Sequence, residues 1–193
     1  MTRSPTRRPA DAPTRRAGVF LDRDGTLVHD PGFLRDPADV VLFAGAAGAI
    51  AQLNRAGLAA IVVTNQSGIA RGLILPEEYR AVEQRIGDLL AAEGASLDAT
   101  FHCPHYPAIT GPCDCRKPGT LLYRQAAEEF HLDLARSWAV GDRLSDLEAV
   151  RRLGGRGILV RTGAGEAYAG DAVRAGYGVA RDLAHAVEQI RSG

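Results

Sequence analysis

Two aspartates, Asp22 and Asp24, stand directly after an apolar run, residues 18–21, and before Gly25. A carboxylate in this position can attack a phosphorus atom and form an aspartyl-phosphate, so Asp22 is a candidate nucleophile. A carboxylate two residues later can protonate the leaving oxygen and then take a proton from the attacking water, which is the role expected for Asp24. Because Asp-Gly is also common in exposed turns, the pair alone leaves a solvated acidic turn as the alternative.

Several small polar residues follow the next apolar run, residues 58–63. Thr64 and the segment Asn65-Gln66-Ser67 could present a hydroxyl and backbone N–H groups to phosphate oxygens. A turn or a helix cap is the alternative for such a segment.

Lys117 is the only lysine among 23 basic residues, and the other 22 are arginines. A lysine ammonium is a compact point charge that suits a phosphoryl oxygen, whereas the planar fork of the adjacent Arg116 suits a second phosphate. The alternative is an ordinary surface Arg-Lys pair, and the rarity of lysine in this chain argues against it.

Asp142 follows a third apolar run, residues 137–140, and precedes Arg143. A carboxylate there, beside Asp22, could share a Mg²⁺ ion, which binds through one or two carboxylates together with the substrate phosphate. Asp142 could instead cap the helix that follows. Asp146 could support the site or be an acid favoured by the dipole in the first turn of that helix.

Three cysteines and a histidine, Cys103, His105, Cys113 and Cys115, lie close together in the sequence. Three thiolates and one imidazole suit a closed, structural Zn²⁺ site. The prolines and the glycine between them predict a compact loop without regular structure, which the metal would brace just ahead of Lys117. The alternative, three buried free cysteines beside an unrelated histidine, does not explain the clustering.

Apolar runs alternate with helical patterns along the chain, which is typical of a parallel sheet covered by helices on both faces. We therefore predict an α/β fold with a Rossmann-like parallel sheet and no large cap domain. In such a fold the carboxyl ends of the strands bring Asp22, Thr64 and Asp142 to one edge. The Gly-rich residues 162–170 are expected to form a loop without an assigned role. The expected strands are residues 18–21, 58–63, 100–102, 137–140 and 157–160, and the expected helices are residues 44–56, 76–93, 120–130, 144–153 and 183–190.

The composition limits the classes of partner. The chain has 193 residues and a formal net charge of zero, which argues against a dedicated nucleic-acid or membrane-surface protein. Residues 1–17 are predicted to be a disordered basic leader without the apolar core of a secretory signal, and residues 18–193 a single domain. No apolar run is long enough for a membrane span. We expect a cytoplasmic monomer that binds a small molecule, with no nucleic acid and no membrane as partners.

Taken in order, these motifs resemble those of the haloacid dehalogenase superfamily of phosphatases, from Gly18 to the last helix. The segments 21–26 (LDRDGT), 64–72 (TNQSGIARG) and 115–118 (CRKP) are most similar to the D-glycero-D-manno-heptose 1,7-bisphosphate phosphatases, with the histidinol-phosphate phosphatases as near relatives. That family carries the same C-x-H…C-x-C pattern. The resemblance implies Mg²⁺-dependent removal of the phosphate at C7 of the heptose, in the synthesis of nucleotide-activated heptose for cell-surface glycans such as lipopolysaccharide.

The resemblance also implies roles for individual residues. Asp22 is the implied nucleophile and Asp24 the implied general acid/base, while Thr64 and Lys117 stabilise the transferred phosphoryl group. The implied Mg²⁺ ligands are Asp22, the backbone of Asp24, and Asp142, and the implied Zn²⁺ ligands are Cys103, His105, Cys113 and Cys115. The implied substrate-binding residues are Asp30, Pro31, Gly32, Phe33, Asn65, Gln66, Ser67, Arg116 and Arg143.

Several alternatives to this activity stay open. The substrate could be histidinol phosphate or another small sugar phosphate, because the segment after Pro118 is two residues shorter than is usual in the family. A polynucleotide 3′-phosphatase shares the first motif, although neutral charge and few aromatics give it little means of holding nucleic acid. A non-enzymatic zinc-loop binding module is the third alternative. A dinucleotide-binding protein is the fourth, but no G-x-G-x-x-G follows the first strand.

Overall fold

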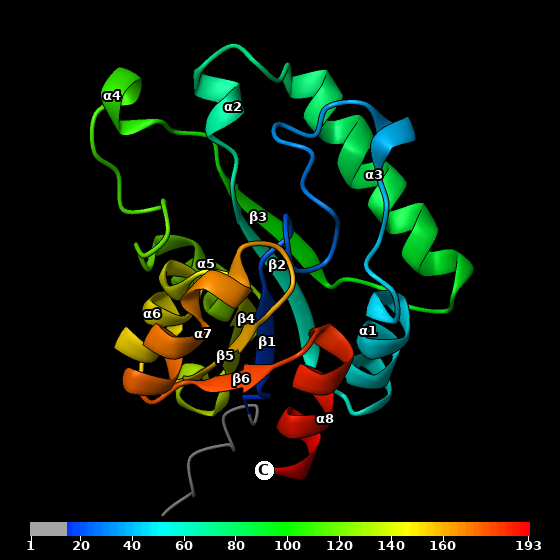
Figure 1. Ribbon diagram of the computed structural model, residues 1–193, viewed down its shortest axis with the longest axis vertical. Helices are drawn as coiled ribbons and strands as arrows, with labels where there is room; N and C mark the ends of the chain where they lie inside the picture. Colours follow the sequence, from blue (N-terminus) through cyan, green and yellow to red (C-terminus); the bar gives the residue numbers. More distant parts are fainter. Residues whose placement is uncertain (1–14) are drawn as a thin grey trace, which may run out of the picture.

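The protein is described by a computed structural model that covers residues 15–193. It contains one six-stranded parallel sheet with the order β3-β2-β1-β4-β5-β6 (Figure 1). The Rossmann-like fold class is therefore confirmed. The predicted leader falls mostly on residues 1–14, outside the described residues. The strands are β1 (Gly18–Leu21), β2 (Ala59–Asn65), β3 (Ala99–Cys103), β4 (Trp138–Gly141), β5 (Arg156–Val160) and β6 (Gly178–Ala180).

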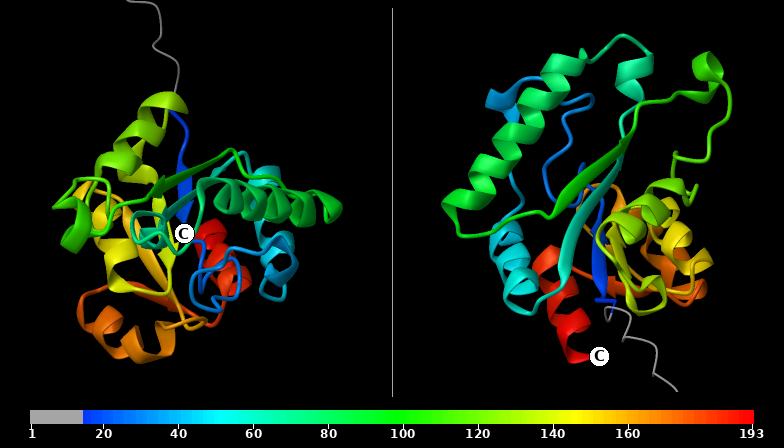
Figure 2. Two further views of the ribbon diagram at one scale, coloured as in Figure 1. Left: turned by 90° about the horizontal axis from the view of Figure 1, so that it is seen from above. Right: turned by 180° about the vertical axis from the view of Figure 1, so that it is seen from behind.

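Helices cover both faces of the sheet. Figure 1 shows α1 and α8 on one side and α5, α6 and α7 on the other, and the two turned views in Figure 2 show the same layers. The α-helices are α1 (Ala46–Arg55), α2 (Ser67–Ala70), α3 (Pro76–Ala92), α4 (Pro107–Thr110), α5 (Leu121–Glu129), α6 (Leu144–Arg152), α7 (Gly165–Arg174) and α8 (Leu183–Ser192). Two 3₁₀ turns are η1 (Pro37–Asp39) and η2 (Leu134–Arg136).

Apolar side chains leave both faces of the central strands, which explains the continuous apolar runs in the sequence. Val19 and Leu21 pack on the side of α1, α3 and α8, whereas Phe20 between them packs with Tyr123 of α5 on the other side. In β2, Ile61 joins Phe20 on that second side. Each strand therefore contributes to two cores, and the sheet is fixed between them.

The strand order reverses between β1 and β4, which is where α/β folds of this kind form their ligand crevice. Asp22 follows β1 and Asp142 follows β4, so both lie at this point. No separate folded unit is inserted after β1 or after β2 in the described chain.

Two segments differ from the sequence prediction. The zinc loop was expected to lack regular structure, but residues 107–110 form α4, because proline is well tolerated at the first position of a helix. Residues 162–170 were expected to be a loop, but α7 begins at Gly165 and is followed by β6. A Cβ at Gly165 would lie 1.7 Å from the carbonyl oxygen of Val160, so glycine there reflects close packing of α7 on β5.

The described chain is already paired just before the first strand. Arg16 forms an isolated β-bridge with Leu132, and its guanidinium lies 2.7 Å from Asp98. None of the helices from residue 15 onward combines the length and apolar character that a membrane crossing requires.

Candidate active site

A cleft of about 490 Å³ opens at the carboxyl edge of the sheet. All the predicted catalytic and substrate-binding residues line it except Pro31, and of the predicted Mg²⁺ ligands Asp142 alone does not. Asp146, which the sequence left between two roles, also lines it. The lining residues are Asp22, Asp24, Asp30, Gly32, Phe33, Leu34, Thr64, Asn65, Gln66, Ser67, Gly68, Arg116, Lys117, Arg143, Ser145 and Asp146.

Lys117 lies at the floor of the cleft with its side chain only 2% exposed. Its Nζ donates to Asp22 Oδ1 at 2.6 Å and to the carbonyl oxygen of Val63 at 2.7 Å, and it lies 2.8 Å from Asp146 Oδ1. These three acceptors match the three N–H groups of an ammonium. The backbone N–H of Arg143 donates to the other Asp146 oxygen, so Asp146 both pairs with Lys117 and caps α6.

The buried carboxylates beside Lys117 are electrostatically costly. The pKa of Asp22 is raised to about 8, mainly by burial. The positive charge of Lys117 opposes this rise, whereas the negative charges of Asp146 and Asp24 add to it. Burial also raises the pKa of Asp142. Burial by itself would lower the pKa of Lys117, but Asp146 and Asp22 outweigh it and raise that pKa. One ammonium therefore offsets only part of the negative charge here.

This surplus of negative charge fits a divalent cation. Single carboxylate oxygens of Asp22, Asp142 and Asp146 lie within 4.8 Å of one another. Asp142 Oδ1 is buried without a hydrogen-bond partner in the described chain, whereas Oδ2 accepts from the backbone N–H of Ala164 at 2.8 Å. Carboxylate oxygens are the ligands that Mg²⁺ prefers, so the donor set fits the predicted ion.

Two glycines allow the backbone to approach Asp142 closely. Gly25 has a φ of +83°, and a Cβ at Gly25 or at Gly163 would lie 2.3 Å from Asp142 Oδ2. Thr162 Oγ1 donates to the Gly25 carbonyl oxygen at 2.8 Å, which ties the two loops together. Sequence reasoning missed the part that residues 162–164 play at the site, and only the density of glycine there could have signalled it.

Asp24 faces the cleft from the same loop as Asp22. Both its oxygens accept from Arg23, and Gln66 Nε2 donates to Asp24 Oδ2 at 2.6 Å and to Thr64 Oγ1 at 3.0 Å. The Asp24 carboxylate is thus held in place by the side chains of Arg23 and Gln66.

Asn65 holds the main chain that carries Lys117. Its Oδ1 accepts from the Lys117 backbone N–H at 3.0 Å, and its Nδ2 donates to the Lys117 carbonyl oxygen at 3.4 Å. Asn65 lines the cleft as expected for a substrate-binding residue, but its side-chain amide is directed to this peptide. Its geometry therefore favours positioning of Lys117.

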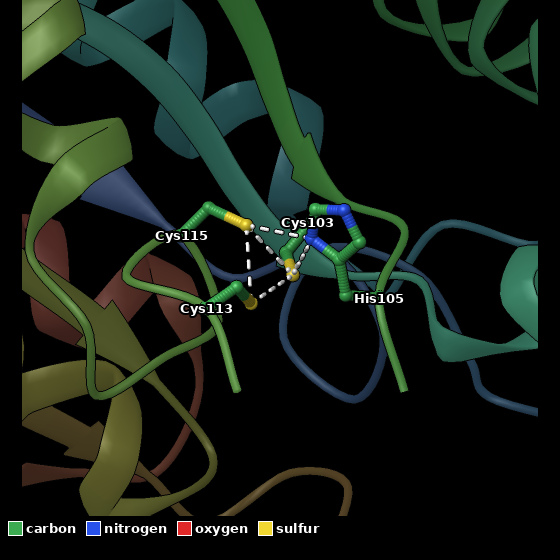
Figure 3. Close-up of side chains that lie close together, drawn as sticks. All are labelled: Cys103, His105, Cys113 and Cys115. Atoms are coloured by element: carbon green, nitrogen blue, oxygen red, sulfur yellow. Dashed lines mark hydrogen bonds between the residues drawn. The ribbon is translucent and has the colours of Figure 1, made fainter. Parts of the chain in front are cut away.

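The four predicted zinc ligands point toward one another (Figure 3). The sulfur of Cys103 lies 3.7 Å from that of Cys113 and 3.1 Å from that of Cys115, and His105 Nδ1 lies 3.1 Å from Cys115 Sγ. A tetrahedral site with Zn–S bonds of about 2.3 Å would place sulfurs about 3.8 Å apart. The cluster is close to that size, so its geometry and donor set fit Zn²⁺.

The loop after the first motif is shaped by a turn and a cation–π stack. Asp30 Oδ1 accepts from the Gly32 backbone N–H at 2.8 Å, and Phe33 follows with a positive φ of 56°. The Arg71 guanidinium lies 4.9 Å from the Phe33 ring and 5.2 Å from the Tyr106 ring, so it joins this loop to the zinc loop. Sequence reasoning missed Arg71 because cation–π pairing between distant segments leaves no local pattern.

Comparison with known proteins places the chain in a family. The HAD-hydrolase-like family model matches residues 114–186. The D-glycero-beta-D-manno-heptose-1,7-bisphosphate 7-phosphatase of Haemophilus ducreyi is 40% identical over 154 residues, which is 77% of this chain and 85% of that protein. The chain belongs to the heptose bisphosphate phosphatase family. The resemblance seen in the sequence is therefore confirmed.

Other members of the heptose bisphosphate phosphatase family match a larger share of the chain. The phosphatase of the same name from Bordetella bronchiseptica is 38% identical over 174 residues, covering 89% of this chain and 96% of that protein. A crystal structure of D,D-heptose 1,7-bisphosphate phosphatase from B. bronchiseptica, complexed with magnesium and phosphate, gives a TM-score of 0.84 at 37% identity and covers 91% of this chain and 98% of that one. The family fold thus extends over nearly the whole described chain.

Proposed function

We propose that this protein is a Mg²⁺-dependent phosphatase that removes the C7 phosphate of D-glycero-β-D-manno-heptose 1,7-bisphosphate. The observation that carries the proposal is the buried Asp22–Lys117 pair at the floor of the cleft, with Asp24 beside it. This arrangement offers a nucleophile, an acid and a fixed positive charge around one reacting atom. The names of the relatives support the heptose substrate and the β anomer.

In the proposed mechanism, an Asp22 oxygen attacks the phosphorus and the bond from phosphorus to the sugar oxygen breaks. Asp24 gives its proton to that oxygen, and heptose 1-phosphate leaves. A water molecule, deprotonated by Asp24, then attacks the aspartyl-phosphate, releases inorganic phosphate and regenerates Asp22. Lys117 and Thr64 stabilise the negative charge on the equatorial oxygens, which is the main demand of a loose phosphoryl transition state.

The metals divide into a catalytic and a structural role in this proposal. Asp22, Asp142 and the backbone of Asp24 would hold Mg²⁺, and the ion would neutralise phosphate charge and help orient the phosphoryl group. Cys103, His105, Cys113 and Cys115 would hold Zn²⁺ in a closed site (Figure 3). Burial raises the pKa of the Cys103 thiol to about 12, and bound zinc would favour its thiolate.

The rest of the substrate would meet the rim of the cleft. Arg116 and Arg143 are proposed to bind the phosphate at C1, because both line the cleft and guanidinium groups suit a bidentate phosphate contact. The loop of residues 30–33 is proposed to contact the sugar. A single phosphatase domain, a monomeric state, a cytoplasmic location and no nucleic-acid or membrane partner remain part of the proposal. Reduced thiolate ligands are consistent with that location.

A substrate panel tests this function. Phosphate release would be measured with Mg²⁺ for both anomers of the heptose bisphosphate, histidinol phosphate, other sugar phosphates and a DNA end with a 3′-phosphate. We expect the β anomer to have the highest kcat/KM and to release one phosphate per sugar. Preference for histidinol phosphate or the DNA end would contradict the proposed substrate. No release from any compound would leave the zinc-loop binding module as the better explanation.

A further inference from the structure

Arg23 is a buried cation that none of the proposed catalytic roles uses. Its side chain is 1% exposed, although the residue stands between two aspartates of the first motif. A buried guanidinium is costly unless its N–H groups are paired. The pairing partners of Arg23 therefore show what this arginine does.

The guanidinium divides its donors between two carboxylates. Nε donates to Asp24 Oδ1 and Nη2 to Asp24 Oδ2, both at 3.0 Å, so one edge of the fork holds both oxygens. Nη1 donates to Glu83 Oε1 at 2.8 Å. Glu83 lies on α3, sixty residues away in sequence, and its side chain is 19% exposed. A bidentate contact fixes the plane of a carboxylate as well as its position.

Aromatic packing holds the arginine from the side. The Arg23 guanidinium carbon lies 5.6 Å from the centre of the Tyr79 ring, and Tyr79 is one helical turn before Glu83 on α3. His102 of β3 packs on Tyr79 with 4.3 Å between ring centroids. Arg23 is therefore fixed by an ion pair and by an aromatic face, both from α3.

These contacts leave one position on Asp24 free. Oδ2 accepts from both Arg23 and Gln66, whereas Oδ1 accepts only from Arg23 Nε in the described part of the chain. The remaining lone pair of Oδ1 is thus the place on this carboxyl group that can carry the transferable proton. Since a misplacement of about 1 Å can cost about 10²-fold in rate, a fixed orientation of this group matters.

From this geometry we infer that Glu83 and Arg23 are positioning residues that hold Asp24 in the orientation for proton transfer to the leaving oxygen. Glu83 anchors the outer N–H group of Arg23, and the opposite edge of the same guanidinium then holds both oxygens of Asp24. The inference rests on the proposed phosphatase function, because it acts through the acid role of Asp24. It extends the site to α3, which contains none of the phosphatase motifs.

The dependence of rate on the leaving group tests this role. A sugar alkoxide needs a proton from Asp24 as it leaves, whereas p-nitrophenolate leaves readily without one. We expect Glu83→Ala to lower kcat/KM about 30-fold for the heptose bisphosphate but less than about threefold for p-nitrophenyl phosphate. Because kcat/KM covers the steps up to formation of the aspartyl-phosphate, it reports the step in which the leaving group departs.

Three further variants complete the design. Glu83→Gln keeps an acceptor for Arg23 and should recover most of the lost kcat/KM, and it remains informative if Glu83→Ala fails to fold. Glu77→Ala changes an exposed position of the same helix and should keep the wild-type kcat/KM for both substrates. Asp24→Asn should show the same leaving-group dependence more strongly, and adding Glu83→Ala to it should cause no additional loss, because Glu83 acts through Asp24.

The outcomes separate this inference from the proposed function. Equal losses for both substrates, or additive losses in the double variant, would overturn the positioning role while leaving the phosphatase function intact. Phosphate release by Asp22→Asn at the wild-type rate would overturn the proposed mechanism, and this inference with it. A leaving-group dependence confined to Glu83→Ala, Asp24→Asn and their combination would support the inference.

Discussion

Replacement of Lys117 by arginine should nearly abolish turnover, although it keeps the positive charge. The Lys117 ammonium is surrounded by Asp22 Oδ1, the Val63 carbonyl oxygen and Asp146 Oδ1 at 2.6, 2.7 and 2.8 Å. A planar guanidinium is larger and directs its donors as a fork, so it cannot meet all three acceptors at this 2% exposed position. Loss of one preorganised donor at a reacting centre costs about 10²–10³ in kcat, or about 2.7–4 kcal/mol.

The assay would measure phosphate release from the heptose bisphosphate under saturating Mg²⁺, with Asp22→Asn as the inactive reference. Arg124→Lys, an exchange of the same two residue types at an exposed position of α5, is the matched control and should keep wild-type turnover. Turnover of Lys117→Arg within about threefold of the wild type would refute the argument that this site requires a compact ammonium.

Removal of the Lys117 charge should affect folding as well as turnover. Substitutions at Cys113, Asp142 and Gly163 test the zinc site, the Mg²⁺ site and the contact between the loop at residue 163 and Asp142. Lys117→Met should lower the free energy of unfolding by about 3–5 kcal/mol, because it leaves buried carboxylates without their partner, and a calorimetric melting temperature unchanged from the wild type would contradict this. Cys113→Ser should reduce the zinc content measured by mass spectrometry and lower the melting temperature, and full zinc occupancy in the variant would count against the ligand set. Asp142→Asn should weaken Mg²⁺ activation at least about tenfold while leaving zinc content unchanged, and an unaltered Mg²⁺ dependence would remove Asp142 from the ligands. Gly163→Ala should lower both stability and activity, because its Cβ would lie 2.3 Å from Asp142 Oδ2, and a variant with wild-type melting and turnover would show that the loop relaxes freely.

The sheet and its catalytic edge could be predicted because their signals are local and strong. The apolar runs of the central strands β1 and β2 are buried on both faces, and the polar residue after each had to emerge at the same edge of a parallel sheet. This reasoning brought Asp22, Thr64 and Asp142 to one edge, whereas Lys117, 95 positions from Asp22, was placed beside it only by the family resemblance. β6 was missed because it has only three residues beside glycines, which is too short for a periodic signal.

Contacts that depend on tertiary packing could not be predicted from the sequence. The sequence assigned Arg23 no role, since no spacing rule connects it with Glu83 on α3. The glycines near residue 163 suggested a loop without an assigned role, whereas in the structure they allow close approach to Asp142 and to β5. In both cases the residue type is explained by a partner that is distant in sequence.

The zinc cluster is connected to Lys117 by strand pairing, by a hydrogen bond and by the chain itself. Cys103 ends β3 in register with Asn65, the last residue of β2, and Asn65 holds the peptide of Lys117. Cys115, two residues before Lys117, joins the same cluster as Cys103. A metal bound here would therefore hold Lys117 in two ways. It would hold the chain just before Lys117 through Cys115, and it would hold Asn65, which binds the Lys117 peptide, through Cys103 and its pairing with β2. Loss of zinc should thus weaken catalysis by releasing Lys117 from its three acceptors, even though none of the four predicted zinc ligands lines the cleft.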